Sequence, residues 1–284
     1  MRWPPYKHVF FDCDSTLSTV EGIDVLAETV GKKWRVEVLT NAAMDGKLDL
    51  EEVYAKRLQA VRPTHEQIQQ IRSVYKRNIV TDAQAVIAAL QFLGHQVYII
   101  SGGLAEPVQE FGVFLGVPKQ NIRAVNVDYD HLSGDWWYAE TDFQKPIRKR
   151  YIDYEEGALT VSDGKAQIVK ELLGRQNGRS LLIGDGSSDL LASHTVDLFV
   201  GFGGVVQRDR VKAESPIFLH TPSLAPLLLL AAGPAAIRQV KGTSHEAVFN
   251  KAFELTNSGA FDFNHERLKQ KFQDAYQTVH TGAD

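Results

Sequence analysis

Short apolar runs alternate with longer amphipathic segments along most of this 284-residue chain. Three of the apolar runs end directly in small or acidic residues, which is typical of buried β-strands. The pattern predicts strands at roughly residues 7–12, 97–100, 122–128, 180–184 and 198–200. Because strands that alternate with helices form parallel sheets with helices on both faces, we expect an α/β fold with a doubly wound, mostly parallel sheet.

A long helical segment interrupts this alternation between the first two strands. It runs from about residue 18 to about residue 80 and contains amphipathic stretches such as Leu50 to Val61. Pro63 and Thr64, followed by Glu66, mark one helix start within it. Because the segment is too long for a simple connection, it predicts an inserted helical cap domain.

The residues beyond about 220 are also predicted to be helical. Two amphipathic stretches, Ala247 to Leu255 and Glu266 to Tyr276, are separated by Asn257-Ser258-Gly259. They could pack on the core, form the contact of a homodimer or cover a functional site, and the sequence leaves these alternatives open. The predicted organisation is a core of residues 1–17 and 81–220, a helical cap of residues 18–80 and a C-terminal helical extension of residues 221–284.

A hairpin is predicted after the third strand. Leu132 to Asp135 indicate a turn, and Trp136 to Tyr138 indicate a returning strand. These aromatic side chains could line a substrate entrance, although such clusters more often cover a core. Strand alternation would place only some of them on one face.

The composition is that of a globular protein, with 44% hydrophobic and 23% charged residues. A formal net charge of −4 gives no support for nucleic-acid binding through bulk electrostatics. The short basic cluster from Lys145 to Arg150 is expected to be a solvated loop. The longest apolar run, Leu224 to Gly233, contains Pro226 and is too short to span a bilayer, so we expect no membrane association.

The chain has a single cysteine, Cys13, and therefore no intrachain disulfide. This is compatible with a reducing compartment, and Met1 to Pro5 lack the apolar stretch of a signal peptide. We therefore expect a cytoplasmic protein. Strand alternation directs the Cys13 side chain away from both neighbouring aspartates, which favours a packing role over that of a nucleophile.

Two carboxylates one residue apart, Asp12 and Asp14, directly follow the first predicted strand. Like charges at this spacing repel each other, and a divalent metal ion is the usual remedy. A carboxylate pair with a hard cation such as Mg²⁺ is also what phosphoryl chemistry needs, because the metal neutralises charge on phosphate oxygens. The motif alone is equally compatible with an ordinary strand end and an Asx-turn.

Two further strand ends carry groups that suit a phosphate. Ser101-Gly102-Gly103 follow the second strand, and Gly184-Asp185-Gly186-Ser187-Ser188-Asp189 follow the fourth. Ligands bind outside the carboxyl ends of parallel strands, where glycines permit close approach and hydroxyl and N–H groups donate to phosphate oxygens. Lys165 is at a helix start, where the dipole disfavours a cation, so it is predicted to meet an anion. Taken by itself, it would be interpreted as a solvated surface lysine.

The order of these motifs, DCDST, ISGG, GK and GDGSSD, resembles the four motifs of the haloacid dehalogenase-like (HAD) phosphatase superfamily. Four motifs in order, each in its expected strand or helix context, are much more specific than any one of them. The resemblance implies a Rossmann-like core with an inserted cap. It also implies a Mg²⁺-dependent phosphomonoester hydrolase that works through an aspartyl-phosphate intermediate.

Within the superfamily, the cap segment is similar to that of phosphoserine phosphatases. The matching segments are Glu21 to Asp24, Ala43 to Leu48 and Lys56-Arg57. In that family the glutamate matching Glu21 and the arginine matching Arg57 contact the amino and carboxylate groups of phosphoserine. A carboxylate suits an ammonium group, and a guanidinium binds a carboxylate bidentately. The implied substrate is therefore a small phosphorylated metabolite of serine biosynthesis, O-phospho-L-serine, which is hydrolysed to serine and phosphate.

The resemblance also implies a role for each matching residue. Asp12 would be the nucleophile, and Asp14 the general acid and base. The substrate and its phosphoryl group would be contacted by Glu21, Met44, Arg57, Ser101, Gly102, Gly103, Lys165 and Ser188. The Mg²⁺ ion would be held by Asp12, the main-chain carbonyl of Asp14 and Asp185, with Asp189 supporting the site or orienting Lys165.

Two departures from the family pattern keep other functions open. Ser188 stands where phosphoserine phosphatases usually carry Asn, so a contact near the phosphate could be lost or replaced by water. The resemblance covers only roughly residues 7–220. The alternatives are an HAD phosphatase or phosphotransferase for another small phosphomonoester and a non-catalytic binding module on the same fold. The intact Asp12, Asp14, Lys165 and Asp185 argue against the binding module.

Overall fold

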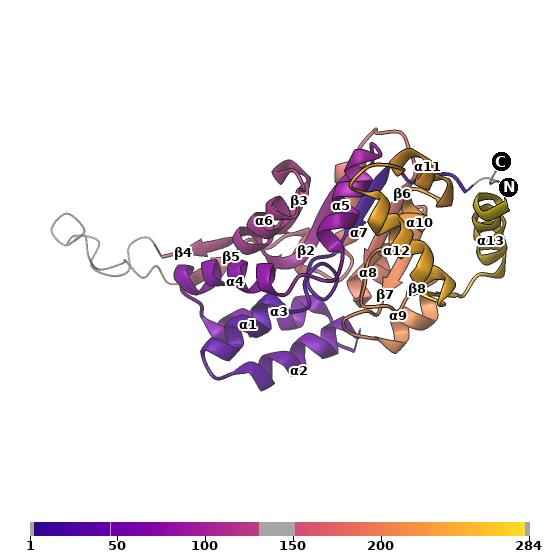
Figure 1. Ribbon diagram of the computed structural model, residues 1–284. Helices are drawn as coiled ribbons and strands as arrows, with labels where there is room; N and C mark the ends of the chain where they lie inside the picture. The colour runs from indigo at the N-terminus through magenta and orange to yellow at the C-terminus, as the bar shows by residue number, and fades with distance from the viewer. Residues whose placement is uncertain (1–2, 46, 131–150, 282–284) are drawn as a thin grey trace.

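A seven-stranded β-sheet forms the core of the protein, and the computed structural model describes residues 3–45, 47–130 and 151–281 (Figure 1). The strand order is β3-β2-β1-β6-β7-β8-β9, and each neighbouring pair except β8 and β9 is parallel. The strands are β3 Ile122–Val125, β2 Gln96–Leu104, β1 His8–Phe11, β6 Ser180–Gly184, β7 Leu198–Phe202, β8 Ile217–Leu219 and β9 Phe261–Phe263. The predicted α/β fold with a mostly parallel sheet is confirmed.

Strand β1 lies where the strand order reverses, between β2 and β6. Phe11 is in register with Ile99 of β2 and with Ile183 of β6, and every residue of β1 is buried. Burial on both faces of the sheet explains the uninterrupted apolar runs of these central strands. Because ligands bind outside the carboxyl ends of the strands at such a reversal, the residue after Phe11 enters the candidate site.

Helices flank the sheet and bury their apolar sides against it or against each other. They are α5 Ala83–Phe92, α6 Ala105–Phe114, α7 Gly164–Leu173, α8 Ser187–Ala192 and α9 Asp209–Glu214. The side chains of Val86, Phe111 and Val169 are fully buried, and this burial of apolar surface stabilises the layers. The helix start predicted at Lys165 is confirmed, because α7 begins at Gly164.

Four helices, grouped at one end of the sheet, form the predicted insertion (Figure 1). They are α1 Gly22–Thr29, α2 Lys33–Met44, α3 Leu50–Val61 and α4 His65–Arg77. Ser18 and Ile79 form an antiparallel bridge, so the two chain crossings into this cap lie side by side. Thr64 caps α4 in a capping box with Gln67, which confirms the helix start predicted there.

The third predicted strand, 122–128, is wrong as one element. It divides into β3, in the large sheet, and β4 Val127–Tyr129, which pairs antiparallel with β5 Tyr151–Tyr154. The chain leaves the sheet because this two-stranded ribbon packs on the cap. The main-chain amide of Tyr151 donates to the Pro63 carbonyl. The ring of Tyr129 packs edge-on against that of His65, with 4.7 Å between the ring centres. The predicted strand Trp136 to Tyr138 and the basic cluster Lys145 to Arg150 lie outside the described residues.

The C-terminal residues pack on the core, which is one of the three alternatives predicted for them. Helices α12 Glu246–Asn257 and α13 Glu266–Thr281 agree with the prediction, and two short helices, α10 Leu227–Ala231 and α11 Ile237–Val240, precede them. Between α12 and α13, strand β9 pairs antiparallel with β8 and extends the sheet, which the sequence did not predict. None of the helices in the described part of the chain has the length and apolar character that a membrane span requires.

Candidate active site

A pocket lies between the carboxyl ends of β1 and β2 and the helical cap. Apolar side chains such as Ile23, Leu58 and Leu159 form part of its wall. All residues predicted to act in catalysis or substrate binding line it: Asp12, Asp14, Glu21, Met44, Arg57, Ser101, Gly102, Gly103, Lys165 and Ser188. The fold thus brings together residues that are far apart in the sequence.

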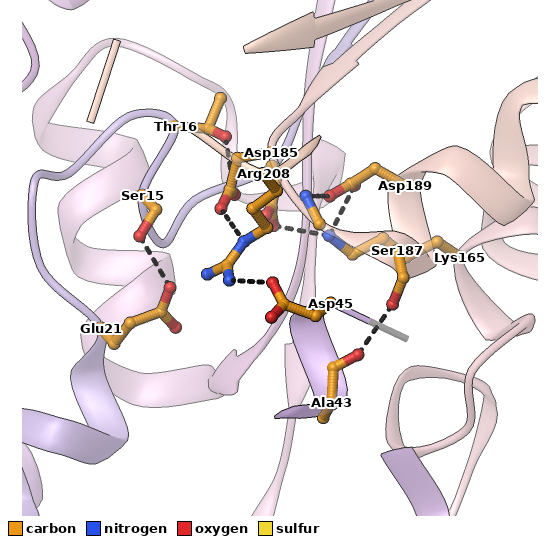
Figure 2. Close-up of polar contacts among 12 residues, drawn as sticks. Ser15, Thr16, Glu21, Ala43, Asp45, Lys165, Asp185, Ser187, Asp189 and Arg208 are labelled. Carbon is orange, nitrogen blue, oxygen red and sulfur yellow. Dashed lines mark hydrogen bonds and ion pairs between the residues drawn. The ribbon is translucent and has the colours of Figure 1, made fainter. Parts of the chain in front are cut away.

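Lys165 connects two buried carboxylates. Its Nζ atom lies 2.7 Å from Oδ1 of Asp12 and 2.7 Å from Oδ1 of Asp189 (Figure 2 shows the pair with Asp189). Burial alone would lower the pKa of Lys165, but the two carboxylates outweigh it and raise this pKa above its ordinary value. Because Lys165 is itself buried, the alternative of a solvated surface lysine is wrong.

A glycine allows Lys165 to reach this position. A Cβ atom at Gly164 would overlap the main-chain carbonyl of Ala158, so helix α7 can begin here only with glycine. In the Gly-Lys motif, Gly164 therefore allows the close approach of the two backbone segments, and Lys165 supplies the positive charge.

A tight turn after β1 directs both motif aspartates into the pocket. Ser15 adopts a left-handed conformation with φ of 54°, which is uncommon for a residue other than glycine. The carbonyl oxygen of Cys13 accepts hydrogen bonds from the amides of Thr16, Leu17 and Ser18. The Cys13 side chain is fully buried, and burial raises the pKa of its thiol well above the usual range, in agreement with a packing role.

Asp14 is held by groups from the cap. Its Oδ1 accepts hydrogen bonds from the Tyr75 hydroxyl at 2.6 Å and from the Gly22 amide at 3.1 Å. A Cβ at Gly103 would lie 2.9 Å from Oδ2 of Asp14, so the glycine leaves room for this carboxylate. Burial and the nearby Glu21 carboxylate raise the pKa of Asp14 well above its ordinary value. Burial and Glu21 therefore favour the protonated form of Asp14 more than in a free aspartic acid.

Three carboxylates meet where a metal ion could bind. Asp12, Asp185 and Asp189 each offer an oxygen, and these oxygens lie within 4.8 Å of one another. All three residues are buried, and carboxylate oxygens are the ligands that hard divalent cations prefer. Burial raises the pKa of Asp185 well above its ordinary value, a cost that a bound cation would offset. The donor set therefore fits a divalent metal ion.

Arg208 adds a positive charge that the sequence analysis missed. Its Nε donates to Oδ2 of Asp185 at 3.2 Å, and its Nη1 donates to Oδ1 of Asp45 in the cap at 3.1 Å (Figure 2). The guanidinium therefore links a candidate metal ligand to the cap. Arg208 belongs to no motif and precedes a short helix near the far end of the sheet, so no local signal identified it.

Two side chains of opposite charge line the cap side of the pocket. Glu21 accepts a hydrogen bond from the Ser15 hydroxyl at 2.7 Å, and burial raises the pKa of its carboxyl (Figure 2). Arg57 is buried, and its Nη1 donates to the Thr40 hydroxyl at 3.3 Å. Its Nε is buried and has no hydrogen-bond partner among the described residues. Such an unpaired charged donor is suited to receive an anionic group of a ligand.

The strand end that was predicted to hold a phosphate is part of β2. This strand continues through Gly103 to Leu104, and its register against β3 shifts between Ile100 and Leu104. The Gly103 amide donates to the Ser101 hydroxyl oxygen at 2.9 Å. The hydroxyl of Tyr54 donates to the Gly102 carbonyl at 2.9 Å and so connects the cap to this strand end.

Tyr54 was also missed by the sequence analysis. It precedes Arg57 by three residues in α3 and therefore lies on the same helical face, and the Arg57 guanidinium carbon lies 5.4 Å from its ring centre. That spacing is a signal that could have identified it.

Comparison with known proteins agrees with this geometry. A family model for haloacid dehalogenase-like hydrolases matches residues 9–194 of the chain. The phosphoserine phosphatase of Mus musculus is 30% identical over 212 residues, which cover 74% of this chain and 88% of the mouse protein. The phosphoserine phosphatase of Drosophila melanogaster is 32% identical over 213 residues, which cover 74% and 73% of the two chains.

Solved structures show the same fold. A structure described as a phospho-aspartyl intermediate analogue of phosphoserine phosphatase superposes with a TM-score of 0.66 at 23% identity, covering 79% of this chain and 98% of the other. A substrate-bound phosphoserine phosphatase complex gives a TM-score of 0.65 at 23% identity, covering 78% and 97%.

Proposed function

This chain belongs to the haloacid dehalogenase-like hydrolases, and from this membership we propose that it is a phosphomonoester hydrolase that converts O-phospho-L-serine to serine and phosphate. The observation that carries the proposal is the position of Glu21 and Arg57 in the same pocket as the Asp12 carboxylate. Phosphoserine has an ammonium and a carboxylate group beside its phosphate ester. The pocket offers a partner of opposite charge to each of these groups. The phosphoserine phosphatase relatives support the same substrate.

Hydrolysis would proceed in two steps. In the first, a carboxylate oxygen of Asp12 attacks phosphorus, and the serine oxygen leaves with a proton from Asp14. In the second, Asp14 takes a proton from a water molecule, which attacks the phosphorus of the aspartyl-phosphate and releases phosphate. The raised pKa of Asp14 supports the first step, because the leaving oxygen needs that proton.

Lys165 and the end of β2 would bind the phosphoryl group. The Lys165 ammonium group contacts the attacking carboxylate, so its charge lies where the phosphoryl oxygens must come. The Ser101 hydroxyl accepts a hydrogen bond from Gly103, which leaves its own proton for a phosphoryl oxygen. The Gly102 amide and Ser188, which line the same pocket, are the further candidates for this contact.

A Mg²⁺ ion is the cofactor that we propose. Asp12, Asp185 and the main-chain carbonyl of Asp14 would hold it, while Asp189 orients Lys165 from behind. When bound, the ion would supply positive charge to a phosphoryl oxygen and offset the repulsion among the carboxylates.

The proposal extends to the domain division, the location, the metabolic role and the oligomeric state of the protein. We propose the division into a core of residues 1–17 and 81–220, a cap of 18–80 and an extension of 221–284. The single cysteine supports a cytoplasmic location, and the phosphoserine phosphatase relatives support a role in serine biosynthesis. A homodimer stays a prediction.

Phosphate release from a panel of small phosphomonoesters in the presence of Mg²⁺ tests the function. The panel contains O-phospho-L-serine, O-phosphoethanolamine and O-phosphoglycolate, and Asp12→Asn is the control. We expect a strong preference for phosphoserine that disappears in Asp12→Asn. Preference for another ester would overturn the substrate, and activity that persists in Asp12→Asn would overturn the mechanism.

A further inference from the structure

Three cap helices meet at a chain of polar side chains beside the pocket, in which Thr40 and Arg57 are buried and Asp24 is half-buried. The Thr40 hydroxyl of α2 donates to Oδ1 of Asp24 of α1 at 3.1 Å, and the Arg57 Nη1 of α3 donates to the same hydroxyl at 3.3 Å. A guanidinium can only donate and a carboxylate can only accept, so a hydroxyl between them has one consistent orientation. The chain Arg57–Thr40–Asp24 therefore fixes the Thr40 proton as well as the guanidinium.

The Thr40 hydroxyl has a hydrogen-bond acceptor that is unusual for a threonine inside a helix. Such a residue commonly returns its hydroxyl proton to the carbonyl four residues earlier in its own helix. Here the proton goes to Asp24 on another helix, although only 1% of Thr40 is exposed. The buried Thr40 hydroxyl is therefore used for a tertiary contact, because it bonds to side chains of two other helices.

The arrangement keeps Arg57 from being neutralised by the Asp24 carboxylate of its own cap. Asp24 attracts the guanidinium, yet the two groups form no direct ion pair among the described residues, because the Thr40 hydroxyl lies between them. The guanidinium is held at Nη1 and lies against the Tyr54 ring, while its buried Nε has no partner in the described part of the chain. The residue that carries this free donor also lines the pocket.

We infer that Thr40 is a positioning residue for substrate recognition, which separates Arg57 from Asp24 and keeps the guanidinium available for the carboxylate group of the substrate. This inference rests on the proposed function, since it assumes that Arg57 binds a substrate carboxylate. Without the hydroxyl, Arg57 would lose its anchor and turn to the Asp24 carboxylate, with which it interacts. Carboxylate-bearing substrates would then compete with Asp24 for the guanidinium.

The test compares two substrates that differ in one group. O-phospho-L-serine has ammonium, carboxylate and phosphate groups, whereas O-phosphoethanolamine lacks the carboxylate. For Thr40→Val, which removes the hydroxyl at nearly constant volume, we expect the KM for phosphoserine to rise about tenfold with kcat within about twofold, as for loss of a hydrogen bond to a charged group. Both constants for phosphoethanolamine should stay within about twofold of wild type. Thr40→Ser, which keeps the hydroxyl, should restore the KM for phosphoserine.

Several outcomes would overturn the inference. They are an equal change for both esters, a fall in kcat at constant KM, no change at all, or failure of Thr40→Ser to restore KM. Thr40→Ala removes the hydroxyl without adding an apolar branch, so it replaces Thr40→Val if that variant does not fold.

Arg57→Ala separates this inference from the proposed function. If Arg57→Ala weakens phosphoserine selectively but the Thr40 variants do not, the inference fails and the proposed function stands. If the wild-type enzyme treats the two esters alike, the proposed substrate fails, and the inference fails with it.

Discussion

The hydroxyl of Tyr75, in the cap, donates a 2.6 Å hydrogen bond to Oδ1 of Asp14, in the core. Both side chains are buried, so solvent does not replace this bond when it is lost. The residue proposed as the general acid is therefore contacted by the cap directly. The cap therefore contributes to the pKa of Asp14, because the Tyr75 and Gly22 hydrogen bonds both lower it.

Tyr75→Phe should move the pH dependence of the reaction. The hydrogen bond favours the ionised carboxylate, so its removal raises the pKa of Asp14 further. Because the first step needs protonated Asp14, kcat/KM for phosphoserine should stay high to a higher pH than in wild type. A pH profile of kcat/KM for the two enzymes is the measurement, and a profile that is unchanged or moves to lower pH would contradict the prediction. Tyr75→Phe keeps the ring, whose centre lies 5.2 Å from that of Phe111. The variant should therefore retain the packing of this side chain and fold as wild type does.

Lys165→Met should destabilise the metal-free protein. Asp12 and Asp189 would be left as two buried carboxylates without their shared counter-charge, which typically costs about 3–5 kcal/mol. Urea unfolding in the presence of a chelator measures the loss, and Lys165→Arg is the matched variant that keeps the charge. Saturating Mg²⁺ should recover part of the loss, since the cation supplies charge to the same carboxylates. Equal stability of Lys165→Met and wild type without metal would contradict the assigned role of the buried pair.

Glu21→Gln should weaken the recognition of the ammonium group. The amide oxygen of Gln can still accept the hydrogen bond from Ser15, so the local structure is retained while the charge is lost. We expect kcat/KM for phosphoserine to fall by about tenfold or more, as for loss of a charged partner. O-phosphoglycolate has a carboxylate but no ammonium group, so its kcat/KM should fall by less than that for phosphoserine, through the effect of the Glu21 charge on the pKa of Asp14 alone. A similar loss for both esters would show that Glu21 acts on the reaction and not on the substrate's amino group.

His8 should make the stability of the protein depend on pH. Burial lowers the pKa of His8 below its ordinary value of 6.5, so the unfolded chain binds a proton at a pH where the folded protein does not. The contribution of His8 is fully present above pH 6.5 and is lost as the pH falls through the folded-state pKa. Unfolding free energies at several pH values between about 7.5 and 5 should therefore fall more for wild type than for His8→Gln. Parallel curves for the two proteins would contradict the prediction.

The sequence was most informative where structure is local. Asp12, Ser101 and Asp185 each follow a short apolar run in the sequence, and the parallel sheet must bring the ends of such runs together. The third predicted strand failed because only one residue, Asn126, separates β3 from β4, and a single turn-favouring residue within an apolar run is too weak a signal for a break. That break depends on contacts with the cap, which are distant in the sequence. Strand β9 was missed for a related reason, since three residues are too few to establish a period of two.

Phe272→Ala should destabilise the protein without affecting the site. Phe272 of α13 is 3% exposed and packs against Trp3 near the N-terminus, at 5.3 Å between ring centres, and against Phe261 and Phe263 of β9. Truncating a buried phenylalanine typically costs about 3–5 kcal/mol. Because β6, β7 and β8 lie between β9 and β1, kcat at a temperature well below the unfolding transition should match that of wild type.

The exposed Phe92 provides the matched control for this variant. Its side chain is 53% exposed, so Phe92→Ala should change the free energy of unfolding by less than about 1 kcal/mol. Thermal unfolding and phosphate release, measured on both variants, decide between three interpretations of residues 221–284. A single unfolding transition that is lowered only in Phe272→Ala means that the extension and the sheet unfold as one cooperative unit, as expected from the pairing of β8 with β9. An unchanged main transition would mean that the extension folds separately, and a loss of kcat at low temperature would mean that it reaches the active site.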